Sequence, residues 1–206
     1  MKHRLTPAIL AGVLALAAPS AALATTAHTA AANATDKAFV REMVPHHEMA
    51  VDMAEMAEMD GVHNQIRSLA GRIVTAQNAE IATMKTIAKR LGVKAEAMPM
   101  NGTMSDQMMS DLGTLGVSMD DSGMMMNMDA LHGAKPFDRK FIDMMIPHHQ
   151  GAIRMARAEL AKGKDSSLRK IATGIVAGQA KEIGEMNSWR KSWYGKTSPA
   201  GGVPKA

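Results

Sequence analysis

The stretch "DKAFVREMVPHHEMAVDMAE", residues 36–55, decides the fold because the chain writes it a second time as "DRKFIDMMIPHHQGAIRMAR", residues 138–157. When residues 36–85 are aligned with residues 138–187 at a constant offset of 102, without gaps, 18 of 50 positions are identical. Both copies contain the same Met-x-Pro-His-His element. An ungapped match of this length indicates an internal duplication.

Each copy has the pattern of two consecutive helices. In the first copy, apolar residues between Phe39 and Ala57 follow the three-and-four spacing of an amphipathic helix, which Gly61 ends. A second helix is predicted over residues 62–91, and the second copy predicts helices near 136–161 and 166–194. A lone helical hairpin cannot bury its apolar face, whereas two hairpins can do so together. We therefore predict an all-α fold, an antiparallel four-helix bundle.

Two features of the first helix leave alternatives open. Thr35 or Asp36 can cap its start. Pro45 cannot donate a hydrogen bond to the carbonyl of Arg41, so the helix either kinks there or begins afresh with the proline as its first residue. In both cases the two histidines of each copy are expected at a perturbed helical turn.

The N-terminus has the pattern of an export signal. Lys2, His3 and Arg4 precede the apolar run "PAILAGVLALAA", and "ALA" at residues 22–24 resembles a cleavage site. The run is shorter than the roughly 20 residues that a membrane-spanning helix needs, and no basic stop-transfer flank follows to support a retained anchor. We expect an exported protein, periplasmic or secreted, without stable membrane insertion.

The whole chain is therefore expected to have six segments. They are a signal peptide at 1–24, a flexible N-terminus at 25–35, a first hairpin at 36–92, a Met-rich linker at 93–135, a second hairpin at 136–195 and a flexible tail at 196–206.

Composition limits the partners and the chemistry. The chain has 24 basic and 20 acidic residues but only six aromatic ones, and no basic stripe, so nucleic-acid binding has little support. It has no cysteine and 21 methionines. Any site for a soft metal must therefore use thioether sulfur and imidazole, the donors that suit Cu(I) and Ag(I).

The Met-x-Pro-His-His elements provide the candidate ligands. On a helix, residues three and four apart lie on one face, so Met43 can lie near His46 and His47. The metal-ligand candidates of both copies are Met43, His46, His47, Met53, Met84, Met145, His148, His149, Met155 and Met186. The alternative is that the methionines are core filler and the histidines cap carbonyls freed by the prolines. Their co-occurrence in both copies favours copper, with Cu(I) preferred and Cu(II) possible.

Several polar residues could support these ligands. Candidate partners that orient an imidazole are Glu48, Gln77, Glu80, Gln179 and Glu182. Glu48 or Glu80 could also add oxygen to a Cu(II) site. A plain helix–helix hydrogen bond is the alternative for the repeated glutamine and glutamate pairs.

The linker is different in kind from the repeats. Ten methionines fall between residues 98 and 128, among Gly, Ser, Asp and Asn, and we expect a mobile segment with room for a short amphipathic turn around Ser105–Leu115. Its candidates for metal capture are Met98, Met100, Met104, Met108, Met109, Met124, Met125, Met126, Met128 and His132. A dynamic contact surface for a partner is the competing explanation.

The two copies differ in charge. Asp52 and Glu55 of the first copy align with Arg154 and Arg157 of the second. We hypothesise that these faces pair within the bundle or between subunits, whereas separate solvated faces are the default.

The second copy carries a family resemblance. "FIDMMIPHHQGAIRMARAEL", residues 141–160, with Gln179, Glu182 and Met186 in the following helix, resembles the domain-of-unknown-function 305 family. The resemblance covers both repeats and implies a ferritin-like four-helix bundle, secretion and, through the CopM-like members, periplasmic copper binding and copper tolerance. The first copy departs from the family pattern, because Glu48-Met49 stands where Gln-Gly is usual.

The leading prediction is an exported, non-enzymatic copper-binding protein that sequesters or ferries Cu(I) or Ag(I), with a copper-trafficking protein as a partner. The rival is a structural or partner-binding helical module without metal. A di-iron enzyme ranks third because the sequence has no Glu-x-x-His motif. The oligomeric state is left open.

Overall fold

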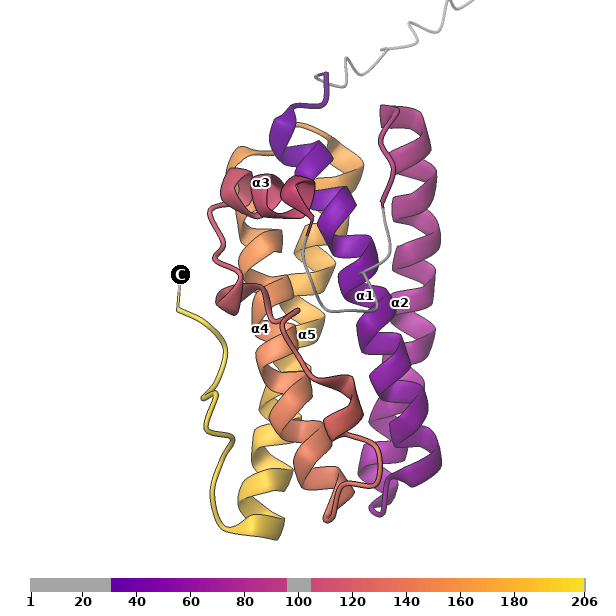
Figure 1. The fold of residues 1–206 in the computed structure, drawn as a ribbon, viewed down its shortest axis with the longest axis vertical. Helices are drawn as coiled ribbons and strands as arrows, with labels where there is room; N and C mark the ends of the chain where they lie inside the picture. The colour runs from indigo at the N-terminus through magenta and orange to yellow at the C-terminus, as the bar shows by residue number, and fades with distance from the viewer. Residues whose placement is uncertain (1–30, 96–104, 206) are drawn as a thin grey trace, which may run out of the picture.

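The computed structural model describes residues 31–95 and 105–205. The elements are α1 (Ala34–Asp60), α2 (Asn64–Leu91), α3 (Asp106–Leu115), the 3₁₀ turns η1 (Asp120–Ser122) and η2 (Met128–Ala130), α4 (Phe137–Lys162) and α5 (Ser166–Tyr194). Four long helices run side by side, and the short α3 packs on α1 and α4 (Figure 1). The predicted all-helical fold is confirmed.

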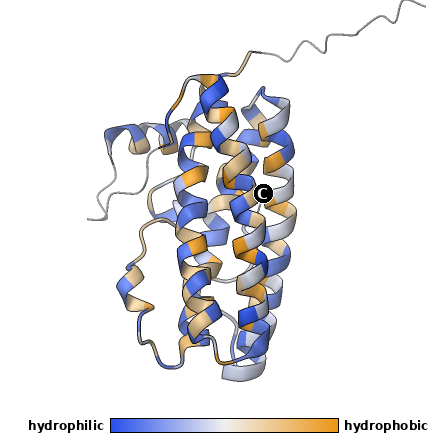
Figure 2. Ribbon diagram, turned by 90° about the vertical axis from the view of Figure 1, so that its right-hand side faces the viewer, coloured by the Kyte–Doolittle hydropathy of each residue, from blue (hydrophilic) through white to orange (hydrophobic). Residues whose placement is uncertain are grey.

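The helix ends follow local chemistry. Asn33, and neither Thr35 nor Asp36, is the N-cap of α1, and it forms a capping box with Asp36. Gly61 and Gly92 end α1 and α2 as predicted, and Gly92 adopts a φ of 65°, which glycine accepts without strain. Around each long helix, polar and apolar residues alternate, as an amphipathic bundle requires (Figure 2).

The two hairpins cap each other. The carboxylate of Asp36 accepts the backbone N–H groups of Lys164 and Asp165 at 2.9 and 2.8 Å, in the turn of the second hairpin. The carboxylate of Asp138, the residue aligned with Asp36, accepts those of Val62 and His63 at 2.8 and 2.9 Å, in the turn of the first. Each repeat thus completes the hydrogen bonding of the other repeat's turn.

The prolines do not start new helices. Pro45 and Pro147 both lie inside unbroken helices, α1 and α4, eleven and ten residues after the first helical residue. The alternative in which each proline begins a fresh helix is therefore wrong.

The linker is more ordered than expected. Ser105 caps α3 by accepting the N–H of Met108 at 3.2 Å, and Gly116 ends the helix in the left-handed conformation. Met108, Leu112 and Leu115, on one face of α3, are buried in the core. The amphipathic turn expected around Ser105–Leu115 is therefore found as α3, and its apolar face packs on the bundle.

The tail is also held in place. Residues 196–205 run along the bundle beside α4 (Figure 1). The side-chain amide of Gln150 donates to the carbonyls of Ala200 and Gly202 at 2.8 and 2.6 Å, and Arg157 donates to those of Pro204 and Lys205 at 2.8 and 2.9 Å. The expected flexible tail is therefore wrong over these residues. None of the helices in the described part of the chain is long and apolar enough to span a membrane.

Candidate metal centre

The histidine pairs meet in the middle of the bundle. α1 supplies His46 and His47, α4 supplies His148 and His149, and the side chains of all four are fully buried. The rings of His46 and His148 lie against each other, with centroids 3.7 Å apart and planes inclined by 39°. The duplication therefore brings both Met-x-Pro-His-His elements to one place.

Hydrogen bonds on the outer nitrogens orient three of these rings. Nε2 of His47 donates to Oε2 of Glu80 at 2.7 Å, and Nε2 of His149 donates to Oε2 of Glu182 at 2.7 Å. Nε2 of His46 donates to the backbone carbonyl of Ser122 at 3.1 Å. Because carboxylate and carbonyl oxygens only accept, we assign the hydrogen of each ring to Nε2. This tautomer leaves a lone pair on Nδ1, the form that binds a metal.

The inner nitrogens have no partner. Nδ1 of all four histidines, together with Nε2 of His148, is buried without a hydrogen bond. Leaving a buried polar atom unsatisfied typically costs about 1–3 kcal/mol. A metal cation in the bundle centre would satisfy such lone pairs.

Burial keeps two of the rings neutral. Desolvation, reinforced by the neighbouring imidazoles, holds the pKa values of His46 and His148 well below the ordinary value of 6.5. Neutral imidazole is the ligand form, so no proton competes with a metal at these rings near pH 7.

All six predicted ligand methionines are fully buried, and they divide between two core clusters. Met43, Met84 and Met155 belong to one cluster, which we call cluster A. Met53, Met145 and Met186 belong to the other, which we call cluster B. Each cluster thus takes two methionines from one repeat and one from the other. Met43 and Met53, although both lie on α1, belong to different clusters.

The histidines do not form a metal-ligand set by themselves. Among residues 31–95 and 105–205, no group of three or more His, Cys, Asp or Glu side chains is arranged to hold a metal ion. The other soft donors in the core are the buried methionines, and a combination of imidazole and thioether suits Cu(I) or Ag(I).

The other polar candidates behave differently from one another. Glu80 and Glu182 contact imidazoles as described, while the side chains of Gln77 and Gln179 are buried and each Oε1 lacks a hydrogen bond. Glu48 accepts from Lys85 at 2.7 Å on the surface, with 37% of its side chain exposed. Glu48 therefore neither orients an imidazole nor adds oxygen to the centre, contrary to expectation.

The linker candidates are spread over several environments. Met98, Met100 and Met104 lie outside the described residues. Met108 and Met124 are buried in cluster A. Met126 and Met128 are half-buried against cluster B, and Met109, Met125 and His132 are exposed.

Sequence reasoning missed the contact between η1 and α4. A Cβ added to Gly151 would lie 1.7 Å from the carbonyl oxygen of Ser122, and one added to Gly123 would lie 2.6 Å from that of Pro147. Only glycine permits this approach, which positions the Ser122 carbonyl against His46. The first copy has Met49 at the position of Gly151, and η1 packs on α4, the helix of the second copy. The only signal of this contact in the sequence was that the second copy has Gln150-Gly151 where the first copy has Glu48-Met49.

The charged faces do not pair with each other inside the bundle. Arg154 pairs with Asp121 at 3.2 Å, and Arg157 binds the tail. Asp52, the residue aligned with Arg154, is exposed, and its pKa is raised by partial burial and by Glu55 and Glu48. The hypothesis of pairing within one chain is therefore wrong.

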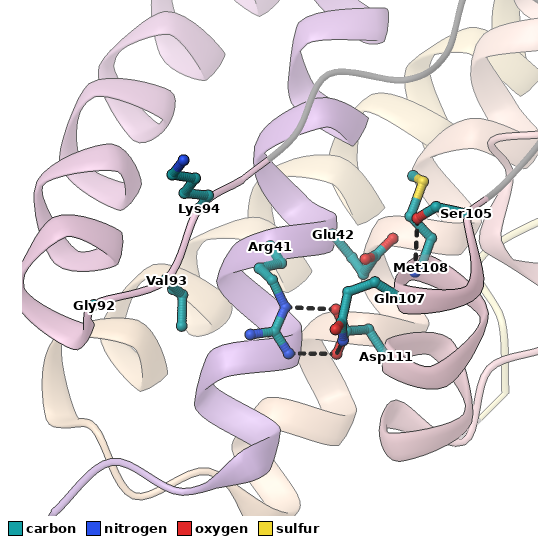
Figure 3. Close-up of a pocket in the computed structure, with 9 residues that line it drawn as sticks. All are labelled: Arg41, Glu42, Gly92, Val93, Lys94, Ser105, Gln107, Met108 and Asp111. Carbon is teal, nitrogen blue, oxygen red and sulfur yellow. Dashed lines mark hydrogen bonds and ion pairs between the residues drawn. The ribbon is translucent and has the colours of Figure 1, made fainter.

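A separate hollow of about 260 Å³ lies between α1, the end of α2 and the start of α3 (Figure 3). Arg41 forms a two-point ion pair with Asp111 there, at 2.6 and 2.5 Å. Burial, reinforced by Asp111, raises the pKa of Glu42 to about 8. Met108 lines the hollow and belongs to cluster A, so the hollow reaches the core.

Known proteins share the sequence pattern and the fold of this chain. The sequence profile of a domain of unknown function, DUF305, matches residues 36–190 and again residues 138–204. CopM solved with Cu(I) is 32% identical over 77% of this chain and 97% of CopM, with a TM-score of 0.62. CopM solved with Cu(II) is 35% identical with the same coverage and a TM-score of 0.64.

Two further relatives extend the comparison. A DUF305 protein of Streptomyces coelicolor, described as secreted, is 23% identical over 80% of this chain and 96% of its own, with a TM-score of 0.64, and shares the fold. Uncharacterized protein L153 of Acanthamoeba polyphaga mimivirus is 41% identical over 51 residues, which are 25% of this chain and 34% of that protein. The match therefore spans about a third of the viral protein.

Proposed function

This chain belongs to the DUF305 family, and within that family we propose that it is an exported, non-enzymatic copper-binding protein that holds Cu(I) in the centre of its bundle. The ligands would be Nδ1 of the central histidines and the sulfur atoms of methionines in clusters A and B. The same donors would accept Ag(I), and Cu(II) could use the imidazoles alone.

One observation carries this proposal. Five imidazole nitrogens of His46, His47, His148 and His149 are buried without partners, while the outer Nε2 atoms of three of these rings are held by Glu80, Glu182 and the Ser122 carbonyl. A core that served packing alone would gain nothing from unpaired nitrogens, because leucine would fill the space without the desolvation cost. The arrangement is that of ligands oriented by their outer hydrogen bonds.

The relatives support the choice of metal and the place of action. CopM, which matches over most of both chains, has been solved with Cu(I), Cu(II) and Ag bound. The Streptomyces relative is described as secreted. The signal-like residues 1–24 support export. We propose copper tolerance as the role, through storage of copper or its transfer to a trafficking protein.

A Cu(I) competition titration against a colorimetric chelator such as bicinchoninate tests the proposal. Wild type should withdraw Cu(I) from the chelator. A variant with leucine in place of His46, His47, His148 and His149 should lose this ability, since leucine keeps the centre apolar but offers no donor. Circular dichroism and thermal unfolding establish that the variant is folded.

The matched control is Met59→Leu, which removes an exposed soft donor outside the centre. It should bind as wild type does. If the quadruple variant binds Cu(I) as tightly as wild type, the central site is wrong. If wild type binds no Cu(I), the rival function, a metal-free helical module, takes its place.

A further inference from the structure

One segment of the linker connects solvent with both methionine clusters. Residues 122–128, "SGMMMNM", which we call the methionine strap, pass from η1 to the start of η2. Met124 is 1% exposed and belongs to cluster A. Met125, the next residue, is 49% exposed. Met126 and Met128 are half-buried and pack against cluster B.

The strap begins on the candidate metal centre. The carbonyl of Ser122 accepts a hydrogen bond from Nε2 of His46 at 3.1 Å. A Cβ on Gly123 would lie 2.8 Å from Cα of His148, so the strap touches the other central histidine as well. A soft cation that binds an exposed strap sulfur is therefore only a few residues of chain away from the buried donors.

We propose that the methionine strap is the access route by which a soft monovalent cation, Cu(I) or Ag(I), passes from solvent to the buried histidines and methionines. Met125 captures the ion, Met126 and Met128 hand it to cluster B, and Met124 hands it to cluster A. Each step exchanges one thioether ligand for another, and the oxidation state of the metal does not change. The inference rests on the proposed function and adds how the site is filled.

The charges around the two candidate openings favour the strap. Asp120, Asp121 and Asp129 flank it. Arg154 pairs with Asp121, which leaves the carboxylates of Asp120 and Asp129 to attract cations.

The hollow of Figure 3 also reaches a cluster A methionine, Met108, but Arg41 and Lys94 line it. Asp111 neutralises Arg41 there. Burial raises the pKa of Glu42 to about 8, so Lys94 gives this path a net positive charge that opposes another cation.

The rate of Cu(I) uptake shows whether the methionine strap is an access route or only packs against the core. In the variant M125L/M126L/M128L, leucine keeps the apolar volume, and a Leu-for-Met exchange costs less than about 1.5 kcal/mol of stability. Cu(I) is supplied as its bicinchoninate complex, and the loss of the complex's colour is followed by stopped flow. We expect loading to slow by about tenfold, which corresponds to ~1.4 kcal/mol in the barrier, with the same amount of Cu(I) bound at the end point.

The control variant is Met59→Leu, which removes a methionine that is 76% exposed but lies outside the strap. It should load at the wild-type rate. Wild-type loading by the strap variant would overturn the route, as would slower loading by Met108→Leu alone. Loss of bound Cu(I) at the end point would make the strap a final site instead of a route. If wild type itself takes up no Cu(I), the proposed function fails, which is a distinguishable result.

Discussion

The imidazoles of His46 and His148 contact each other where α1 and α4 meet, with their centroids 3.7 Å apart and their planes inclined by 39°. These residues occupy equivalent positions in the two repeats, so the duplication builds one shared centre in the middle of the bundle. The outer hydrogen bonds of His47 and His149 are equally matched, at 2.7 Å each. The other two rings differ: Nε2 of His46 donates to the carbonyl of Ser122, whereas neither ring nitrogen of His148 has a hydrogen-bond partner in the described part of the chain.

The carboxylates behind His47 and His149 should control metal affinity. Replacing both Glu80 and Glu182 with alanine frees the two rings to rotate, and loss of such an orienting partner typically weakens metal binding about 10- to 100-fold. The amount of Cu(I) bound should not change. Chelator competition measures both quantities. Glu48→Ala is the control, because Glu48 pairs with Lys85 on the surface; equal effects of the three substitutions would refute the orienting role.

Gly151 should be required for the seating of the methionine strap. An alanine Cβ there would lie 1.7 Å from the carbonyl oxygen of Ser122, so Gly151→Ala should destabilise the fold by about 1–3 kcal/mol, as overpacking does. Gly178→Ala is the matched control in α5, since a Cβ at Gly178 meets nothing within 4 Å. It should stabilise by roughly 0.5–1 kcal/mol because alanine favours a helix. Urea unfolding of both variants gives the comparison, and stabilisation by Gly151→Ala would exclude the close contact.

Asp138 should stabilise the docking of one hairpin on the other. Asp138→Ala leaves the N–H groups of Val62 and His63 without their acceptor. Because these hydrogen bonds are only partly buried, we expect a loss of about 1–2 kcal/mol in total. Asp36→Ala should destabilise similarly, because Asp36 holds Lys164 and Asp165 in the same way. Thermal unfolding measures the loss. Asp106→Ala, at an exposed position in the first turn of α3, should change stability far less.

Stability should fall as the pH rises through a buried carboxyl group. Burial, reinforced by Asp36, raises the pKa of Glu159 from its ordinary 4.5 to about 8. Between these pH values the folded protein retains a proton that the unfolded chain has released, so this contribution is complete below pH 4.5 and lost as the pH passes 8. Replacing Glu159 with glutamine, which does not titrate, should remove this pH dependence of stability.

Urea unfolding at pH 5.5 and pH 8.5 tests this prediction. The stability of Glu159→Gln relative to wild type should increase between the two pH values. The exposed substitution Glu58→Gln should show no such change. A Glu159→Gln variant whose advantage is the same at both pH values would contradict the raised pKa.

The helices could be predicted because the duplication gives two independent views of one pattern. The helix expected over 166–194 is found at Ser166–Tyr194, and the one near 136–161 at Phe137–Lys162. The order within the linker was less visible, since its glycines and serines hide the single apolar face of α3. The tail is held by hydrogen bonds to its backbone carbonyls, which no side-chain pattern reveals.

The site was predictable in its residue types but not in its pairings. The repeated histidines and glutamates are 33 residues apart in each copy, and their repetition marks them as partners. In contrast, the hydrogen bond from His46 to Ser122 joins a side chain to a carbonyl 76 residues away. Met43 and Met53 lie on one helix but in different clusters, and spacing along that helix does not show which side chains of the facing helices surround each of them.

The most direct test of the central claim is a crystal structure of residues 25–206 with Cu(I) or Ag(I) bound, with the metal located by its anomalous scattering. We predict a metal in the centre of the bundle, bonded to Nδ1 of at least one of His46, His47, His148 and His149 and to a methionine sulfur. Metal bound only on the surface, with the central imidazoles unligated, would contradict the account.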